Sequence, residues 1–340
     1  MIYSKQIDEI RNYMDQSGVR YDPDVQLSQF SYFRSGGVAK LIIYPGTESE
    51  LCAVLQFMFR GEFEYKVIGE TSNLMFLDDR NYGVLISLQR LNKINCNLEE
   101  GKIVAEAGAE LPELARRALV WGFSGFEGLE GIPGTVGGAV VMNAGAYECE
   151  IRDCLICIHA LRRDGTFCEL SRDDLRLDYR SSLLRERSGE YIVLRAFFSA
   201  TKGDPQKIFE KMELLHAKRH KYQDFIYPTL GSLFSTSLTY ALGHSDKRYR
   251  IMLRLISIIF YSKKFRRETP MNQRVLNRFI CRYFGWQFDV QPFSDKTMNC
   301  LTNRGQHTDR FVEYIELLRK HLPASAPLEN EIMYNGCYNE

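Results

Sequence analysis

Small residues dominate the stretch from Gly131 to Tyr147, which contains five glycines in seventeen residues. Glycine tolerates positive φ and lets the backbone approach a ligand closely, so successive N–H groups can point into one concavity. A concavity of this kind suits a diphosphate with its two negative charges. The stretch matches neither the Rossmann nor the P-loop glycine pattern, so neither of those mechanisms is indicated. Tight packing at a buried turn is the alternative interpretation.

A second turn of small polar residues follows the apolar pair Val67-Ile68 and runs from Gly69 to Leu74. Its sequence, Gly-Glu-Thr-Ser-Asn-Leu, provides a hydroxyl and an amide that can bind phosphate oxygens. The apolar pair before it is typical of a strand that ends at this turn. The two stretches together predict a binding site for a phosphorylated ligand.

Taken together, five motifs resemble the UDP-N-acetylenolpyruvoylglucosamine reductases in order and spacing. The turn from Gly69 to Leu74, which is the first along the chain, is similar to the family's Gly-x-Gly-Ser-Asn-Leu. The long run from Gly131 to Tyr147 is similar to its Gly-Ile-Pro-Gly-Thr-Val-Gly-Gly…Asn-Ala-Gly-Ala-Tyr. Asp178 to Ser182 resembles Tyr-Arg-x-Ser, Gly231 to Phe234 resembles Gly-Ser-x-Phe, and Leu328 to Ile332 resembles Leu-x-x-Glu-Val. The resemblance covers residues 27 to 333, and the long glycine run is its most specific part.

The resemblance implies an α+β protein with an FAD-binding fold of two α+β subdomains, of the PCMH and vanillyl-alcohol-oxidase type, and a smaller α+β substrate-binding domain. The expected division is 1–80 and 81–203 for the FAD-binding subdomains, 204–325 for the substrate domain, and 326–340 for a tail that returns to the active site. FAD would be held non-covalently, and NADPH would donate hydride. The substrate would be a nucleotide sugar of peptidoglycan precursor synthesis.

The resemblance also assigns the chemistry to three residues. Ser232 would donate a proton, while Arg180 and Glu331 would hold the substrate carboxylate and stabilise the developing enolate. A guanidinium suits an enolate beside a carboxylate in a site that excludes water. A serine is a weak acid and needs a neighbour such as Glu331, kept protonated by burial, to relay a proton. Taken alone, each residue fits a structural role better, Arg180 as a surface ion-pair partner, Ser232 as a turn residue and Glu331 as a solvated carboxylate, and only the joint order of the motifs favours catalysis.

Binding residues carry over from the same motifs. The resemblance implies FAD contacts from both turns, by Gly69, Glu70, Thr71, Ser72, Asn73, Leu74, Ile132, Pro133, Gly134, Thr135, Gly137, Gly138, Asn143, Gly145, Ala146 and Tyr147. It implies substrate contacts by Tyr179, Arg219, Gly231 and Thr236.

The chain departs from the family pattern after Gly-Ser-x-Phe, where the usual Lys-Asn-Pro is replaced by Ser235-Thr236-Ser237. Hydroxyls bring no positive charge to a diphosphate. The basic stretch from His216 to Lys221 could compensate, or it could be a solvated helix end. Residues 290 to 300 also fit the family loosely. Two alternatives therefore stay open: an oxidase or dehydrogenase of the same fold acting on another nucleotide sugar or carbohydrate, and a flavin-binding protein without turnover.

The cysteine and histidine spacing argues against a metal. Cys149, Cys154 and Cys157 have the C-x4-C-x2-C spacing of some iron–sulfur sites, but no fourth ligand follows at a telling distance. Cysteine acting as a small hydrophobe in a buried strand is the preferred interpretation. The six histidines show no metal-binding spacing, so we predict no metal.

Mixed strands and helices are expected up to residue 203, where Gly203-Asp204-Pro205 marks a boundary. Apolar runs predict strands at 39–44, 84–88, 103–107, 155–161 and 191–199. Thr47 to Glu50 forms a capping box before one helix, and Glu110 to Trp121 predicts another. Further helices are expected from 206 to about 222, in a region rich in Arg and Lys that ends at Phe284, and around 311–322. A strand-like tail is expected around Ile332.

Composition excludes several classes. The 340 residues carry a net charge of +1, which gives no general attraction to nucleic acid. No secretory signal or spanning segment is expected, and nine scattered cysteines suggest a reducing cytoplasm. Lys247 to Arg267 places basic residues, including Lys263, Lys264, Arg266 and Arg267, around an apolar run. That pattern suits an interfacial helix near anionic lipid, although an ordinary helix of the substrate domain is the preferred interpretation.

Overall fold

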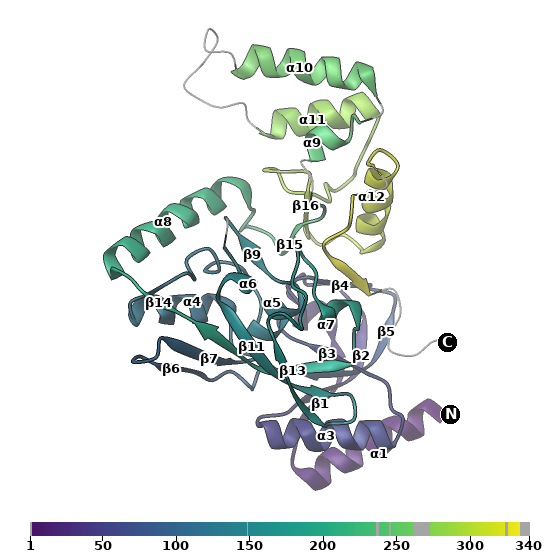
Figure 1. Ribbon diagram of the computed structural model, residues 1–340. Helices are drawn as coiled ribbons and strands as arrows, with labels where there is room; N and C mark the ends of the chain where they lie inside the picture. The colour runs from purple at the N-terminus through teal and green to yellow at the C-terminus, as the bar shows by residue number, and fades with distance from the viewer. Residues whose placement is uncertain are drawn as a thin grey trace.

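The computed structural model describes residues 2–147, 149–235, 238–244, 246–261, 273–323 and 326–333. Figure 1 shows two regions built on β-sheets at one end and a region rich in helices at the other. Thr236, Lys263, Lys264, Arg266 and Arg267 lie outside the described residues. The functional site lies where the regions meet, so each is described by the part of the site that it holds.

The first region is a four-stranded sheet in the order β1-β2-β5-β3, formed by Arg20–Gln26, Val38–Tyr44, Asn81–Ser87 and Tyr65–Ile68. The strands β2, β5 and β3 are parallel, and β1 is antiparallel to β2. On one face Leu41 and Val84 pack in a core with the helices α1 (Ile2–Ser17) and α3 (Glu48–Arg60). On the other face Ile42 packs in a separate cluster. Burial on both faces explains why the central strands are continuously apolar.

The second region is a five-stranded antiparallel sheet in the order β12-β11-β13-β7-β6, formed by Phe167–Ser171, Leu155–Arg162, Tyr191–Ser199, Lys102–Glu106 and Ile94–Asn97. Its core is continuous with that of the first region and includes residues of α4 (Leu111–Val120) and α5 (Val136–Val141). The division expected at residue 80 separates β5 from the sheet in which it pairs. The sheets instead separate after β5.

Short elements connect the two sheets and shape the site between them. They are α2 (Leu27–Phe30), β4 (Leu74–Phe76), β8 (Phe123–Ser124), β9 (Gly145–Ala146), β10 (Cys149–Glu150), α6 (Ile151–Cys154), α7 (Leu183–Glu186) and β14 (Thr201–Lys202). β8 pairs with β14, and β9 pairs with β10. Several of these segments carry the turns that hold functional side chains.

The third region begins with α8 (Pro205–Tyr222), which starts where Asp204 accepts a hydrogen bond from the N–H of Gln206. The remaining elements are β15 (Thr229–Ser232), α9 (Leu238–Ala241), α10 (Lys247–Tyr261), α11 (Gln273–Phe284), β16 (Cys300–Thr302) and α12 (Asp309–Arg319). A separate core of mainly aromatic and aliphatic residues holds the region together. The predicted boundary near residue 203 falls between β14 and α8.

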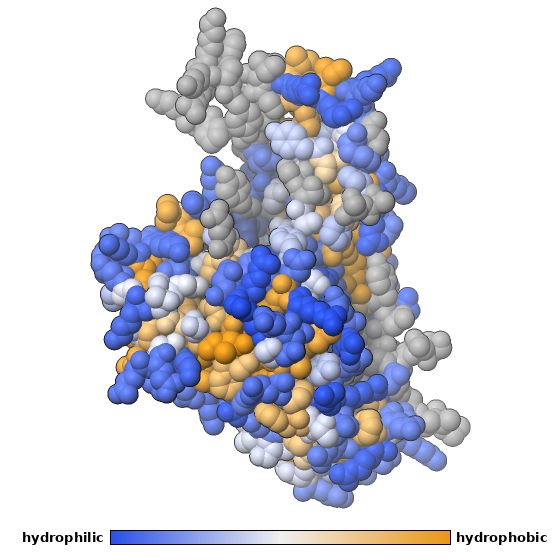
Figure 2. Space-filling view, in the orientation of Figure 1, coloured by the Kyte–Doolittle hydropathy of each residue, from blue (hydrophilic) through white to orange (hydrophobic). Residues whose placement is uncertain are grey.

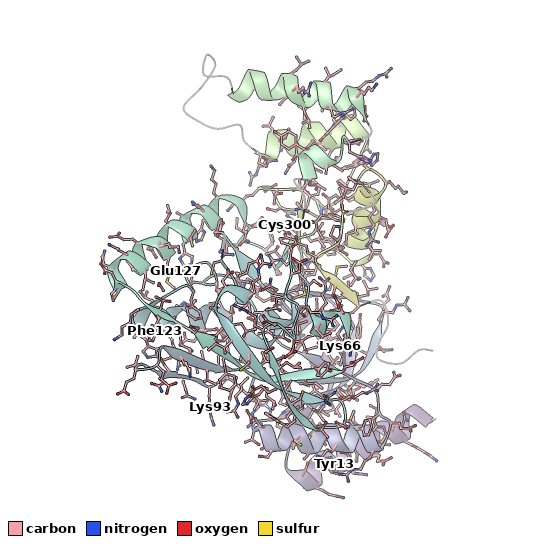
Figure 3. The ribbon with its side chains drawn as sticks, in the orientation of Figure 1. Tyr13, Lys66, Lys93, Phe123, Glu127 and Cys300 are labelled. Atoms are coloured by element: carbon pink, nitrogen blue, oxygen red, sulfur yellow. The ribbon has the colours of Figure 1, made fainter. Side chains whose placement is uncertain are left out.

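Two contacts dock the third region on the others. Lys211 of α8 pairs with the buried Glu127, whose position Figure 3 labels, at 3.3 Å. Asn303 donates hydrogen bonds to the carbonyl oxygens of Phe33 and Arg34 at 2.8 and 2.9 Å. Phe33 is also part of the third region's core. The third region is therefore packed against the first rather than joined to it only by the chain.

The last described strand, β17 (Glu331–Met333), returns from the third region and pairs in parallel with β4. The Tyr82 hydroxyl donates to the carbonyl oxygen of Met333 at 2.9 Å, which anchors this strand against the first sheet. The strand expected around Ile332 is thereby confirmed. It carries Glu331 to the region of the first glycine-containing turn.

Candidate active site

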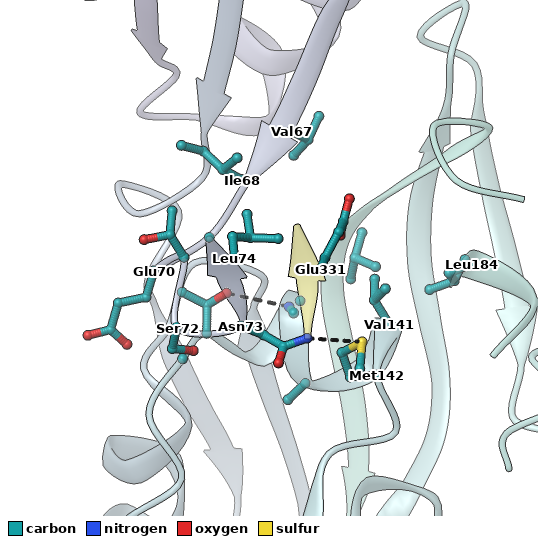
Figure 4. Close-up of a pocket in the computed structure, with 18 of the residues that line it drawn as sticks. Val67, Ile68, Glu70, Ser72, Asn73, Leu74, Val141, Met142, Leu184 and Glu331 are labelled. Carbon is teal, nitrogen blue, oxygen red and sulfur yellow. Dashed lines mark hydrogen bonds between the residues drawn. The ribbon is translucent and has the colours of Figure 1, made fainter. Parts of the chain in front are cut away.

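One cavity of about 980 Å³ lies between the three regions. Both small-residue turns, the end of β15 and the strand β17 line it. Figure 4 shows Asn73 and Leu74 of the first turn, Met142 after α5 and Glu331 of β17 around the same space. A volume of this size is in the range of cofactor sites, roughly 300–1,000 Å³.

The first turn is held in shape by bonds to three other segments. Thr71 has φ +60° and is buried, and its Oγ1 accepts a hydrogen bond from the N–H of Tyr32 at 2.9 Å. The Ser72 hydroxyl donates to the carbonyl oxygen of Pro133 at 2.8 Å and so ties the two turns together. Asn73 accepts from the N–H of Glu331 at 3.0 Å through its carbonyl oxygen. The turn therefore positions both the glycine run and the C-terminal strand.

The glycine run approaches the first turn more closely than a side chain would permit. A Cβ on Gly69 would lie 2.3 Å from the Thr135 Oγ1, so only glycine fits there. Gly134 has φ +130°, a conformation that L-residues with side chains rarely adopt. Thr135 then caps α5 by accepting a hydrogen bond from the Gly138 N–H. Close backbone contact explains why this sequence is so rich in small residues.

The donors around the cavity fit the diphosphate of FAD. In the described part of the chain, the backbone N–H groups of Ser72, Asn73 and Thr135 have no hydrogen-bond partner. Free N–H groups beside glycine-lined turns are suited to bind phosphate oxygens. Glu70 also lines the cavity, where burial raises the pKa of its carboxyl and the N–H of Gly134 counteracts that rise.

Most of the predicted FAD-contacting residues line this cavity. They are Gly69, Glu70, Thr71, Ser72, Asn73, Leu74, Ile132, Pro133, Gly134, Thr135, Gly137, Gly138, Gly145 and Ala146. Asn143 and Tyr147 lie outside the lining. Asn143 is buried and donates to the carbonyl oxygen of Asp178 at 3.0 Å, so its contacts support the turn that carries Arg180. The ring of Tyr147 instead lies 5.4 Å from the Arg219 guanidinium.

Arg180 projects into the cavity from a tight turn closed by mutual hydrogen bonds between Asp178 and Ser181. Its φ is +50°, a strained conformation for a residue with a side chain. Its Nε donates to Glu329 at 3.2 Å and its Nη2 donates to the carbonyl oxygen of Gly145 at 3.0 Å. In the described part of the chain, Nη1 has no partner, so one arm of the guanidinium remains for an anionic ligand.

Glu329 is a site residue that the sequence motifs did not indicate. Its side chain is buried and accepts from Arg180 and, at 2.9 Å, from the hydroxyl of Tyr179. Burial, followed by the charge of Glu329, raises the pKa of the Tyr179 phenol. Tyr179 itself lies outside the cavity lining, and it contacts two residues that line it, Glu329 through its hydroxyl and Arg180 through its ring, 5.7 Å from the guanidinium. The Leu-x-x-Glu-Val motif specifies only the second glutamate, Glu331, and leaves the residue at position 329 open.

Glu331 lines the cavity, but its side chain is not buried as expected. Its side chain is 49% exposed and forms an ion pair with Lys66 of β3. The burial that the sequence interpretation assumed for Glu331 does not match this exposure. Lys66 was not predicted, since the partner lies on a strand distant in sequence.

Ser232 lies at the end of β15 and lines the same cavity. Its residue is exposed, and its hydroxyl has no hydrogen-bond partner within the described ranges. Gly231 before it has φ +73° with open space where a Cβ would stand, so the serine follows a sharp turn. A free hydroxyl at the cavity edge is available to a substrate.

Arg219 differs from the other basic residues near the end of α8. It is 3% exposed and lines the cavity, whereas Lys218 and Lys221 are exposed. Its Nη2 donates to the carbonyl oxygens of Gly128 and Glu130 at 3.2 and 3.1 Å. Its buried Nε has no partner among the described residues, and desolvation lowers the pKa of the guanidinium. The end of α8 therefore buries one of its cationic side chains, Arg219, and exposes the lysines beside it.

The cysteine triplet is arranged as a packing feature. Cys149 and Cys154 are buried, and burial raises the pKa of both thiols. Cys157 lies on β11. A separate group formed by Asp79, His307 and Asp309 is exposed at the surface, where both carboxylates pair with the imidazole. The absence of a metal stays a prediction.

The fold defines the chain as a flavoprotein. Residues 39–171 match the model of a family described as FAD binding domain. The chain is 36% identical over 217 residues to the UDP-N-acetylenolpyruvoylglucosamine reductase of Exiguobacterium sibiricum, covering 64% of this chain and 70% of that protein. It is 38% identical over 208 residues to the reductase of Carboxydothermus hydrogenoformans, covering 61% and 68% of the two chains.

A solved structure agrees with these relatives. The UDP-N-acetylenolpyruvylglucosamine reductase of Thermus caldophilus superposes with a TM-score of 0.67 at 25% identity, covering 92% of this chain and 99% of that chain. The chain belongs to the family of UDP-N-acetylenolpyruvoylglucosamine reductases and is an FAD-dependent oxidoreductase. The expected fold, with its FAD-binding domain, is thereby confirmed.

Proposed function

We propose that this chain uses NADPH to reduce the enolpyruvyl ether of UDP-N-acetylenolpyruvoylglucosamine to the lactyl ether of UDP-N-acetylmuramate, a peptidoglycan precursor. Its family supports this reaction, as does one observation on the chain itself. Arg180, Ser232 and Glu331 come from three separate segments and line one cavity with both phosphate-binding turns. A protein that only bound flavin would have no use for all three.

FAD, when bound, would accept hydride from NADPH and supply it to one carbon of the enolpyruvyl double bond. The chain's own residues then manage charge and proton. Arg180 presents its free Nη1 to the substrate carboxylate and stabilises the enolate, because a preorganised cation acts strongly where water is excluded. Ser232 gives its hydroxyl proton to the other carbon, which completes the lactyl ether.

Glu331 and Lys66 would restore the proton that Ser232 loses. Glu331 and Lys66 form an ion pair on the cavity wall, so a proton can pass between them. Glu331 can assist the serine only after taking up a proton, and Lys66 is the neighbouring group that can supply it. This arrangement replaces the buried, protonated carboxyl expected from the sequence.

The substrate diphosphate would be bound at the α8 end of the cavity. Arg219 and Gly231 line that end, and the buried Arg219 Nε is a donor without a partner among the described residues. Arg219 can therefore supply part of the charge lost with the Lys-Asn-Pro segment. We also place the reaction in the cytoplasm, since eight described cysteines are free thiols.

The test is an anaerobic absorbance titration of the purified holoprotein. NADPH should bleach the oxidised flavin band, and subsequent UDP-N-acetylenolpyruvoylglucosamine should restore it with formation of the lactyl ether. A flavin that bleaches but does not recover would move the reaction to another acceptor and reject this substrate. Bleaching by a sugar in place of NADPH would identify a dehydrogenase that runs in the opposite direction.

A further inference from the structure

The helix α10 has a second apolar face that the protein core does not cover. Leu253 and Ile256 are buried on its inner face, as expected for an ordinary helix of this region. On the outer face Ile251 and Leu255 are 58% and 56% exposed. Figure 1 shows α10 as the outermost helix of the third region, far from the sheets, and Figure 2 shows hydrophobic and hydrophilic surface side by side over it.

The neighbouring helix α11 repeats this pattern with greater regularity. Arg274, Arg278 and Arg282 are exposed at intervals of four residues, which places them in one row along the helix. Val275 and Phe279, 43% and 48% exposed, form a second row directly beside the arginines. The helix therefore displays cations and apolar side chains on adjoining strips of its outer surface.

Positive charge is concentrated on these two helices. Together α10 and α11 contain seven Lys and Arg residues and no Asp or Glu, in a chain whose net charge is only +1. Two nearby acids are already engaged. Asp246 accepts from the hydroxyl of Tyr283 and from backbone N–H groups, and Asp295 pairs with Arg274 at 2.8 Å. Most of the helix cations therefore face solvent without a compensating acid in the described part of the chain.

We propose that the outer faces of α10 and α11, defined as the basic-apolar surface, bind the surface of a bilayer that contains anionic lipid. Cations attract anionic headgroups, and exposed aliphatic and aromatic side chains between them insert at the acyl boundary. A nucleic acid or an acidic protein would use the cations but leave Ile251, Leu255 and Phe279 in water. No helix in the described part of the chain is both long enough and apolar enough to cross a bilayer.

The test is flotation of the FAD-loaded full chain with vesicles of phosphatidylcholine alone or with added phosphatidylglycerol. The chain should float only with the anionic vesicles, and less at high salt. Each cation near an anionic surface strengthens binding by about fivefold, so Arg250→Gln/Arg254→Gln/Arg278→Gln should weaken it by about a hundredfold. Ile251→Ser/Leu255→Ser should weaken binding by at least about tenfold, since both side chains lose their apolar contact.

Matched variants elsewhere should leave flotation unchanged. Arg310→Gln/Arg319→Gln removes two exposed cations from α12, and Val120→Ser removes an apolar side chain that is 81% exposed on α4. Flavin reduction by NADPH should be normal in all variants, which checks their folding. No flotation by the unaltered chain, or equal flotation with neutral vesicles, would overturn the proposal. Flotation that needs the arginines but not Ile251 and Leu255 would overturn the insertion of the apolar side chains, because the chain would then adsorb through charge alone.

Discussion

The hydroxyl of Ser232 is exposed at the edge of the cavity, and its role as proton donor can be separated from binding. We predict that Ser232→Ala leaves FAD binding and flavin reduction by NADPH intact. Reduction of the enolpyruvyl substrate should fall by about 10²–10⁴-fold, the usual contribution of a positioned general acid. Stopped-flow measurement of the two half-reactions checks this.

The matched control for Ser232 is Ser188→Ala, because Ser188 is another exposed serine that lines the same cavity. It should leave both half-reactions at the unaltered rate. If Ser232→Ala slowed both half-reactions equally, the serine would have a structural role and the assignment of the proton donor would fail.

The carboxylate of Glu329 holds Arg180 and Tyr179 at once, so we predict that it is a positioning residue. Glu329→Gln keeps the size of the side chain but loses the charge-assisted bond to Arg180, which is worth about 1.5–3 kcal/mol. We expect kcat/KM for the enolpyruvyl substrate to fall by about tenfold to a hundredfold, with flavin reduction by NADPH unchanged.

Tyr179→Phe provides the comparison for Glu329, since it removes the other bond to the same carboxylate while leaving the Arg180 contact. Its effect on kcat/KM should be smaller than that of Glu329→Gln. A loss in Glu329→Gln that appears equally in FAD binding would show that the residue stabilises the fold and does not orient Arg180.

At the scale of elements, the glycine at position 134 makes the second turn possible. We predict that Gly134→Ala weakens FAD binding by about fivefold to a hundredfold, because φ +130° is strained by about 1–3 kcal/mol for a residue with a side chain. Fluorescence titration of the apoprotein with FAD measures the dissociation constant.

Gly125→Ala is the matched control for the turn. Gly125 also has positive φ, +106°, and open space at the Cβ position, but it lies outside the cavity lining. It should lower the free energy of unfolding without changing the FAD dissociation constant. Equal weakening of FAD binding in both variants would mean that strain acts through general stability.

The elements themselves followed from local sequence patterns to a large extent. The strand expected at 191–199 is β13, and the capping Thr47 accepts from the N–H of Glu50 at the start of α3 as predicted. The helix α1 was not predicted, because its burial depends on packing against segments distant in sequence, such as α3, where Tyr13 stacks on Phe57. Local sequence patterns predict turns and helices or strands, whereas the segments that pack against one another are determined by the tertiary fold.

The candidate site shows the same division. The glycine turns and Arg180, Ser232 and Glu331 could be found from motifs that are contiguous in sequence. The bonds from Glu329 to Arg180 and from Lys66 to Glu331 join residues on segments far apart, so no spacing in the chain reveals them. The burial of a side chain depends on such tertiary contacts, which is why the expected burial of Glu331 was wrong.

At the scale of the whole molecule, the cavity touches all three regions, so its ligand should stabilise them together. We predict that FAD at about 100 times its dissociation constant raises the free energy of unfolding by about 2.7 kcal/mol. Differential scanning calorimetry of apoprotein and holoprotein should show one transition that moves to higher temperature.

The parts of the chain that FAD protects from unfolding provide a sharper test than the size of the stabilisation. Limited proteolysis should become slower in α8 and β17 as well as in the FAD-binding sheets, because both elements line the cavity or adjoin it. Gly134→Ala should show weaker protection at the same FAD concentration, because its binding site is less fully occupied. Protection confined to the sheets would contradict a cavity shared by the three regions.

The pairing of β17 with β4 also has a consequence for the order of events during synthesis. The first phosphate-binding turn emerges early from the ribosome, yet the strand that completes the wall beside it emerges only after α12. Glu329 and Glu331 arrive with that strand, so a nascent chain that lacks it has Arg180 and Lys66 without their carboxylate partners. Under the proposed mechanism, turnover therefore requires translation of residues 329–333, and a chain that ends earlier would have both small-residue turns but an incomplete cavity wall.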